Sequence, residues 1–319
     1  MKIVFISRYQ GKVERGVENY AAELAERLGK KHQVEILTSA WRLLGNQKRP
    51  GLTVARPGLK IIYPLNGYFQ TLGCRLYAWI TGAKLVVGGH AGIGRDDRWN
   101  LYMFPDLFIA FSQKGYEWAK KVNPFVKIVK IPHGVDLKKF NPAVKPAKLS
   151  LASPIFIIVS HLVPYKRGGE TVKAVAELKR GSLLILGEGP LEKEIDELGN
   201  RLLGPKRYLR LVTSYNQVAK YLLAADVFTL ASESSEAFGL VYLEAMACNL
   251  PIVATDDSLR RELVGNAGVF VKNPENSKEY ARTLEAAAKA DWGNKPVNQA
   301  KKFGWGKIEE KYLDQFKGI

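Results

Sequence analysis

Short apolar runs alternate with helical segments along most of this 319-residue chain. Residues 2–7 are almost all apolar and predict a buried strand, and residues 17–28 repeat large apolar side chains at helical spacing. Gly29 ends that helix, and residues 34–38 predict the next strand. A strand, a helix and a second strand in this order form a parallel, right-handed unit, so the sequence predicts an α/β fold.

The alternation restarts after a linker at about residues 141–154, which holds three prolines and few large apolar side chains. We therefore predict two doubly wound domains, at residues 1–145 and 150–302, and an amphipathic helix at about 303–319 that packs back on the first domain. Further strands are predicted at residues 52–56, 60–63, 84–88, 107–111, 127–131, 155–160, 183–186, 209–212, 227–230 and 252–255.

The chain is strongly basic, with 48 Lys and Arg against 31 Asp and Glu and a formal net charge of +17. The excess lies in the first half, because residues 1–150 hold 25 basic and 10 acidic side chains. Such a charge favours nucleic acid, an anionic membrane surface or acidic substrates as partners. We find no RNP, helix-turn-helix or zinc pattern, so we expect no specific nucleic acid partner.

Cysteine usage and the apolar pattern indicate the compartment. The only cysteines, Cys74 and Cys248, lie far apart and form no zinc or disulfide pattern. The first residues lack the features of a signal peptide, and no apolar run is long enough to span a membrane. We therefore expect a cytoplasmic protein, with a peripheral place on the inner membrane face left open.

The segment from Glu236 to Glu244 carries the sharpest chemical signal. Glu236 ends a strand-to-helix loop and Glu244 lies about two turns further on, so both carboxylates face one crevice. Phe238, Gly239 and Leu240 begin the helix, where free amides form an anion site. This pattern predicts phosphates held between hydroxylated rings, as in a nucleotide diphosphate sugar. The alternative is a solvated acidic helix start.

This segment, with the Glu-Ala-Met-Ala-Cys-x-x-Pro-Ile-Val-Ala-Thr-Asp run that starts at its second Glu, resembles the signature of family 4 retaining glycosyltransferases, which have the GT-B fold. The resemblance implies that Glu244 binds the donor ribose and that Glu236 holds the hydroxyls of the transferred sugar. It also implies that Phe238, Gly239 and Leu240 bind the donor, with the last two amides on the diphosphate.

The loop at residues 160–168 resembles the Gly-Arg-x4-Lys-Gly segment of the same family. The resemblance implies that Lys166 neutralises the departing diphosphate. His161 stands where the family has Arg, and an imidazole cannot form the bidentate fork of a guanidinium. Either Arg167 or Arg8 substitutes for it, or phosphate binding is weaker in this chain.

The first half carries two candidate residues. Gly16 resembles the second glycine of the family's Gly-Gly-x-Glu loop, which implies that the backbone approaches the donor there, although Arg15 replaces the first glycine. His90 ends an apolar strand and resembles the family histidine beside the reacting bond; the alternative is a structural histidine. The segment at 131–142 resembles the hinge into the second domain, with His133 in place of Asn.

Two further patterns favour structural roles. The Gly187-Glu-Gly189-Pro turn resembles a segment of the same family. Taken by itself, the motif indicates only a tight turn. Asp226, before a strand, is interpreted as a cap and not as a ligand.

The resemblance implies a retaining, metal-independent hexosyltransferase that needs no cofactor. It would move a sugar from a UDP- or GDP-linked donor to a glycan or lipid acceptor, with Glu236, His90 and Lys166 as catalytic residues. No Asp-x-Asp metal motif occurs in the sequence. Two alternatives remain: another GT-B protein, such as a non-catalytic relative, an epimerase or a phosphorylase, and a basic module that binds nucleic acid or membrane.

The basic first domain is expected to bind the acceptor. A cationic surface suits an acceptor seated in an anionic membrane. The aromatic and apolar segment Tyr68–Ile80 suits insertion into such an interface; the alternative is a helix buried in the first domain.

Overall fold

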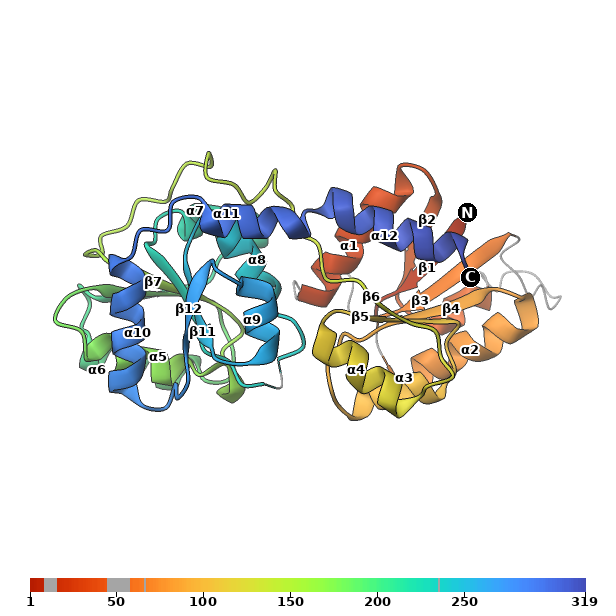
Figure 1. The fold of residues 1–319 in the computed structure, drawn as a ribbon, viewed down its shortest axis with the longest axis horizontal. Coiled ribbons are helices and arrows are strands. Elements are labelled where there is room, and N and C mark those ends of the chain that lie inside the picture. Colours follow the sequence, from red (N-terminus) through yellow and green to blue (C-terminus); the bar gives the residue numbers. More distant parts are fainter. Residues whose placement is uncertain (9–15, 45–57, 66, 235) are drawn as a thin grey trace. The chain divides into compact units, whose positions relative to one another are not determined.

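The computed structural model describes residues 1–8, 16–44, 58–65, 67–234 and 236–319. They form two compact units, shown in Figure 1. Unit 1 comprises Met1–Gly134 and Gly306–Ile319, and unit 2 comprises Val135–Trp305. Each unit is a parallel sheet with helices on both faces, so the predicted α/β class is confirmed. The strand predicted at 52–56 lies outside the described residues.

The sheet of unit 1 has the strand order β2-β1-β3-β4-β5-β6. Its strands begin and end close to the predicted positions because buried parallel strands read as continuous apolar runs. Helices α1 and α12 cover one face and α2, α3 and α4 cover the other (Figure 1). The strands are β1 (Lys2–Ile6), β2 (Gln33–Leu37), β3 (Leu59–Pro64), β4 (Lys84–Gly88), β5 (Leu107–Ala110) and β6 (Ile128–Lys130). The helices are α1 (Gly16–Gly29), η1 (Ala40–Leu44), α2 (Phe69–Thr81), α3 (Arg95–Tyr102), α4 (Gln113–Val122) and α12 (Trp305–Lys317).

The core of unit 1 includes a segment from the far end of the chain. Helix α12 buries Ile308, Tyr312 and Phe316, the face predicted from their spacing. The hydroxyl of Tyr20 on α1 donates a hydrogen bond of 2.5 Å to that of Tyr312. Residues far apart in sequence thus complete one core.

The sheet of unit 2 has the order β12-β11-β10-β7-β8-β9, so its first strand lies between its second and its fourth. This is the order of a dinucleotide-binding fold, with the topological switch point between β7 and β10. The sequence pattern did not predict β12 (Gly268–Val271). The other strands are β7 (Ile155–Val159), β8 (Ser182–Leu186), β9 (Tyr208–Leu211), β10 (Val227–Leu230) and β11 (Ile252–Thr255). The helices are η2 (Pro164–Lys166), α5 (Gly168–Ala176), α6 (Glu192–Leu202), η3 (Tyr215–Gln217), α7 (Val218–Leu222), α8 (Leu240–Ala247), α9 (Ser258–Val264), α10 (Ser277–Lys289), α11 (Lys295–Ala300) and η4 (Lys301–Phe303).

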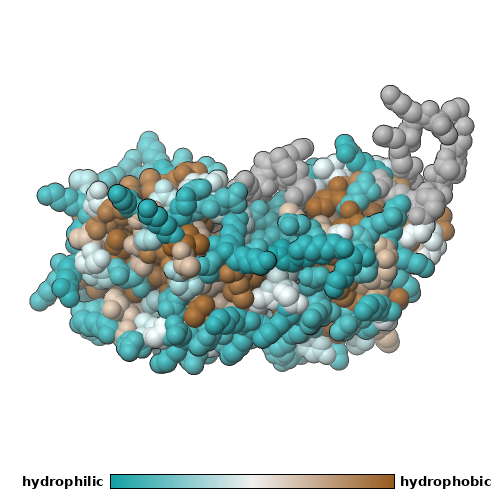
Figure 2. All heavy atoms as spheres, turned by 90° about the horizontal axis from the view of Figure 1, so that it is seen from above, coloured by the Kyte–Doolittle hydropathy of each residue, from teal (hydrophilic) through white to brown (hydrophobic). Residues whose placement is uncertain are grey.

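On the face of the molecule drawn in Figure 2, hydrophilic side chains are widespread, and apolar side chains appear between them. None of the helices in the described ranges is long and apolar enough to cross a bilayer. Cys74 and Cys248 are free and buried, and burial raises the pKa of each thiol to about 12.

Candidate functional site

The loops that follow β7 and β10 leave neighbouring strands at the switch point of unit 2. In open α/β sheets ligands bind at this place, outside the carboxyl ends of the strands. The first loop, residues 160–167, carries Lys166, and the second, residues 231–239, carries Glu236. The backbone joins the two loops directly, because the amide of Glu233 donates to the carbonyl of Tyr165 at 2.8 Å.

Lys166 and Glu236 form the central contact of the site. The Nζ of Lys166 donates to the Oε2 of Glu236, and the two side chains expose only 13% and 12% of their surface. A cation and a carboxylate that are mostly shielded from water stabilise one another in the charged state. The structure therefore brings together two of the three residues predicted as catalytic.

The turn predicted at Gly187 and Gly189 packs against the backbone of the Lys166 loop. A Cβ at Gly187 would lie 1.9 Å from the carbonyl oxygen of Ser160, and one at Gly189 would lie 2.6 Å from that of Leu162. The amide of Leu162 also donates to the carbonyl of Glu188 at 2.9 Å. Only glycine allows this approach, so the Gly-x-Gly motif fixes the path of the loop that carries Lys166.

Helix α8 begins at Leu240, one residue later than the sequence suggests. Gly239 precedes it with a φ of 85°, and a Cβ there would lie 2.6 Å from the ring of Tyr242. The amides of Gly239 and Leu240 donate to no acceptor among the described residues. The ring of Phe238 is buried. Two amides at a helix start beside Lys166 and Glu236 have the arrangement that an anion site requires, and phosphate binding there stays a prediction.

Glu244 is buried on α8, and its carboxylate accepts a hydrogen bond from another loop. The hydroxyl of Tyr215 donates to its Oε1 at 2.8 Å. The Nζ of Lys139 lies 3.5 Å from the centroid of the Tyr215 ring and donates to the Oδ1 of Asn216 at 2.8 Å. The loop after β9 is therefore joined to the carboxylate expected to bind the ribose.

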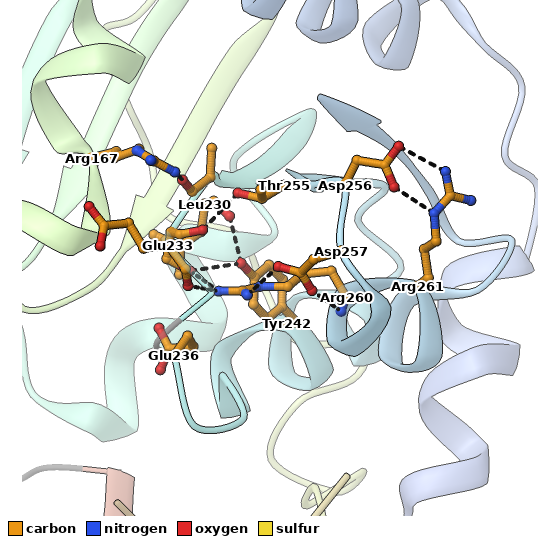
Figure 3. Close-up of polar contacts among 12 residues, drawn as sticks. Arg167, Leu230, Glu233, Glu236, Tyr242, Thr255, Asp256, Asp257, Arg260 and Arg261 are labelled. Atoms are coloured by element: carbon orange, nitrogen blue, oxygen red, sulfur yellow. Dashed lines mark hydrogen bonds and ion pairs between the residues drawn. The ribbon is translucent and has the colours of Figure 1, made fainter. Parts of the chain in front are cut away.

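Arg260 on α9 is a residue that the sequence analysis missed. Its side chain is fully buried, and its guanidinium binds Asp257 Oδ2 at 2.5 Å, Ser232 Oγ at 2.6 Å and the carbonyl of Glu233 at 2.8 Å. Figure 3 shows these bonds beside the loop that carries Glu236. Arg260 thus holds the loop that carries Glu236 in place, and we treat it as a positioning residue. A buried Arg looks like a surface Arg in sequence, so no signal there marks it.

Arg167, His161 and Arg8 are the other predicted phosphate ligands. The guanidinium of Arg167 donates to the carbonyl of Ala231 at 3.4 Å and to Glu275 at 3.3 Å, so it ties β10 to the loop before α10. His161 is exposed in the Lys166 loop, and Arg8 is exposed after β1 in unit 1. Arg167 therefore also supports the loop, and both Arg167 and His161 stay predicted donor ligands.

His90 lies two residues after β4 in unit 1, and its ring packs among other rings. The ring centroid lies 4.7 Å from that of Phe111 and 5.1 Å from that of Tyr20. Both ring nitrogens are buried and make no hydrogen bond within the described residues. Burial lowers the pKa of His90 to about 3, so the ring is neutral at pH 7.

His133 belongs to the same buried cluster. Its ring stacks on Phe111 with centroids 3.9 Å apart, and burial, with His90 nearby, lowers its pKa well below the usual range. Asp97, on α3, lies behind the loop after His90, since its Oδ2 is 3.5 Å from a Cβ built at Gly89. Burial raises the pKa of Asp97 to about 7. The two histidines at the carboxyl edge of unit 1 are therefore neutral at pH 7.

The remaining predictions concern single residues. Gly16 is exposed at the first position of α1, and Arg15 lies outside the described residues. Asp226 is structural, as predicted: its carboxylate accepts from the amide of Ile155 at 2.6 Å and so joins β10 to the start of β7. In the described part of the chain, no group of three or more His, Cys, Asp and Glu is placed to hold a metal ion.

Two six-stranded parallel sheets flanked by helices are the architecture of GT-B proteins, as the resemblance implied. The model of the family "Glycosyl transferases group 1" matches residues 143–303, which are half of the chain. The chain belongs to this family.

Curated relatives match part of their own length. A GDP-mannose-dependent alpha-(1-6)-phosphatidylinositol dimannoside mannosyltransferase of Mycobacterium tuberculosis is 32% identical over 167 residues, which cover 49% of this chain and 43% of the relative. A D-inositol 3-phosphate glycosyltransferase of Kineococcus radiotolerans is 29% identical over 225 residues, covering 60% and 52%. The chain thus spans about half the length of these relatives.

Solved structures share the fold over the whole chain. Anabaena Alr3699/HepE, in complex with UDP and glucose, has a TM-score of 0.75 and 19% identity, with all of both chains covered. Sucrose-phosphate synthase of Thermosynechococcus elongatus has a TM-score of 0.78 and 18% identity, covering 100% of this chain and 98% of that chain. These likenesses establish the fold.

Proposed function

We propose that this chain is a glycosyltransferase that binds a nucleotide diphosphate sugar in unit 2 and transfers the sugar to an acceptor with retention of configuration. The observation that carries the proposal is the Lys166–Glu236 contact at the switch point, beside the amides of Gly239 and Leu240. The match of the family model to residues 143–303, within unit 2, supports donor binding there.

Lys166 and the start of α8 would neutralise the departing diphosphate. Negative charge grows on the bridging oxygen as the bond from the sugar breaks. A fixed ammonium group and two unpaired amides stabilise that charge without having to reorganise. On this basis we propose transfer that requires no metal. When the donor binds, a phosphate oxygen replaces the Glu236 carboxylate as the partner of Lys166.

Glu236 would then accept hydrogen bonds from hydroxyls of the transferred sugar and would not attack it. The acceptor oxygen bonds to the anomeric carbon on the face from which the diphosphate leaves. The carbon–oxygen bond to the phosphate breaks, and the acceptor proton passes to a phosphate oxygen. Glu236 steadies the positive charge on the ring during this step. The same-face path accounts for retention without a covalent intermediate.

The other predicted residues complete the donor site. Glu244, held by Tyr215, would accept the ribose hydroxyls through charge-assisted bonds. His90 is neutral, so its unpaired ring nitrogens would donate to or accept from a sugar hydroxyl without adding charge. Unit 1 would contribute His90 and Gly16 and bind the acceptor.

Relatives suggest which donors and acceptors to test first. A named relative uses GDP-mannose and acts on a phosphatidylinositol dimannoside, and a structural neighbour is in complex with UDP and glucose. We propose a UDP- or GDP-linked hexose as donor and a lipid-linked or glycan-precursor acceptor.

A thermal-shift screen of the full chain against UDP, GDP, UDP-glucose and GDP-mannose tests donor binding. A ligand at 100 times its Kd adds about 2.7 kcal/mol to the free energy of unfolding. The matched variant Lys166→Met should lose most of the shift, because it removes the cation from the diphosphate. If none of the four ligands shifts the wild-type chain, donor binding in unit 2 is wrong.

Product analysis then separates transfer from the alternatives. We expect nucleotide release that depends on an added acceptor, an unchanged anomeric configuration by NMR, and activity that survives a chelator. An epimerised donor sugar without an acceptor would identify an epimerase instead. An inverted product would contradict retention, and loss of activity with the chelator would contradict metal independence.

A further inference from the structure

Helix α2 turns a large apolar face to solvent. Phe69, Trp79 and Ile80 are 90%, 66% and 72% exposed, and Leu72 and Leu76 are also exposed. Their spacing of three and four residues places them on one side of the helix. Cys74 and Tyr77 are among the residues that pack the opposite side into the unit 1 core. The buried-helix alternative therefore accounts for only half of α2.

The outer face of α2 carries no charged side chain. Its single charged residue, Arg75, is buried and bonds to Asp106 Oδ2 at 3.0 Å and to the carbonyl of Phe104 at 2.9 Å. The guanidinium carbon lies 5.1 Å from the centroid of the Trp79 ring, which supports that ring at the surface. Arg75 thus stabilises the helix from inside and leaves its exterior wholly uncharged.

Helix α3 lies beside α2 and extends the apolar area. Thr71 on α2 donates to the Oδ1 of Asn100 on α3 at 2.9 Å. The bond from Arg75 to Phe104 holds the end of α3 against α2 in the same way. Trp99, Tyr102 and Phe104 are exposed on this neighbour. We call the exposed apolar side chains of α2 and these three together the α2–α3 face.

The exposed charges beside this face are positive. Arg95 and Arg98 on α3 are exposed. Of the two acidic residues of the helix, Asp97 is buried, and Asp96 is half-buried and accepts a hydrogen bond from the hydroxyl of Tyr68. Arginines beside an exposed area of aromatic and aliphatic side chains suit a partner with an apolar interior and a negatively charged surface.

We propose that the α2–α3 face binds the interface of an anionic lipid bilayer. Trp, Tyr and Phe side chains partition into the headgroup region, and Leu and Ile reach the acyl boundary. Exposed Arg side chains attract anionic headgroups over a Debye length. A second copy of the chain would also bury the apolar area, but it would bring the same arginines to the contact, where like charges repel one another.

Co-sedimentation of the full chain with vesicles tests this proposal without any sugar donor. We expect binding to phosphatidylcholine vesicles that contain phosphatidylglycerol and weaker binding to phosphatidylcholine alone. Adding salt should weaken binding to the anionic vesicles. The double variant Trp79→Ser/Ile80→Ser should reduce partitioning about tenfold, because two side chains no longer enter the interface. Arg95→Gln/Arg98→Gln should remove most of the dependence on phosphatidylglycerol.

The matched control is Leu202→Ser, which removes an exposed apolar side chain from α6 in unit 2. It should bind vesicles as the wild type does, and thermal unfolding confirms that each variant is folded. The proposal is overturned if the wild type does not sediment with anionic vesicles at low salt, or if the Trp79/Ile80 variant sediments equally. It is also overturned if the wild type forms dimers through this face and does not bind the vesicles. The thermal-shift screen for donor binding in unit 2 is a separate measurement. A failure of vesicle binding therefore leaves the proposed donor site untouched, and a failure of donor binding leaves the α2–α3 face untouched.

Discussion

The carboxyl edges of the two sheets hold very different side chains. In unit 2, Lys166 and Glu236 are charged and paired, and Arg260 is buried beneath them. In unit 1, His90 and His133 are packed among aromatic rings, and burial keeps both neutral. The basic excess of the chain nevertheless falls in residues 1–150. Net charge therefore describes the outside of a unit, while the ionic chemistry of a site depends on the few side chains that its loops bring together.

Among the variants that test this comparison, removal of the Arg260 side chain should have the largest effect. In Arg260→Met, Asp257, Ser232 and the Glu233 carbonyl lose their buried donor, so we expect the free energy of unfolding to fall by about 3–5 kcal/mol. Chemical denaturation of the variant measures this loss.

The neighbouring arginine supplies the control. Arg261 pairs with Asp256 at 2.5 Å, but its side chain is 59% exposed (Figure 3). Such surface pairs contribute about 0–1 kcal/mol, so Arg261→Met should change little. Equal losses in the two variants would show that burial at Arg260 does not anchor the Glu236 loop.

Glu236→Gln tests whether the charged side chains at the carboxyl edge of unit 2 take part in sugar transfer. We expect kcat to fall about a hundredfold, because the amide cannot stabilise positive charge on the sugar ring, while nucleotide affinity is retained. Steady-state kinetics and calorimetry measure the two quantities. Glu233→Gln is the matched control, because the Glu233 side chain is exposed in the same loop and its backbone makes the bonds to Arg260 and Tyr165. Transfer by Glu236→Gln at the wild-type rate would remove this residue from the mechanism.

Buried His90, at the carboxyl edge of unit 1, should make the stability of the chain depend on pH. This effect should be smaller than those of the Arg260 and Glu236 variants. His90 has a pKa of about 3 when folded and about 6.5 when unfolded, so the unfolded chain binds more protons between these values. His90 therefore contributes stability that is fully present above pH 6.5 and is lost as the pH falls, by about 1.4 kcal/mol per unit.

Denaturation of wild type and His90→Gln from pH 7 to below pH 6 should show this difference, with a shallower loss in the variant. Asp97 acts in the opposite direction, because its pKa is raised to about 7, so the wild-type curve alone is not diagnostic. The difference between the two proteins isolates the imidazole. Parallel curves would mean that His90 is as solvated in the folded chain as in the unfolded one.

The sequence predicted most strands and the loops of the donor site. Buried parallel strands such as Ile155–Val159 are continuous apolar runs, and each is followed by a loop that carries polar residues to one edge. Lys166 and Glu236 could be found because each follows such a run. The strand Gly268–Val271 was missed because it is short and begins with glycine.

Properties that depend on neighbours far along the chain were not predictable. Arg260 can be buried because Ser232 and Glu233 accept its hydrogen bonds, and they precede it by more than two dozen residues. The ring of His90 packs against Tyr20 and Phe111, which lie on other elements. For the segment Tyr68–Ile80, the periodicity of apolar residues is the same on a buried and on an exposed face. Only the packing of the unit shows which side is which.

The place of α12 in unit 1 has a consequence for folding. Val135–Trp305 is contiguous, so unit 2 can fold as soon as it has been synthesised. Unit 1 is interrupted by it, and the Tyr20 hydroxyl finds its partner Tyr312 only after residues 306–319 have been made. During synthesis, the first unit to emerge therefore keeps an incomplete core until the second has folded, and its exposed apolar surface is a target for chaperones throughout that interval.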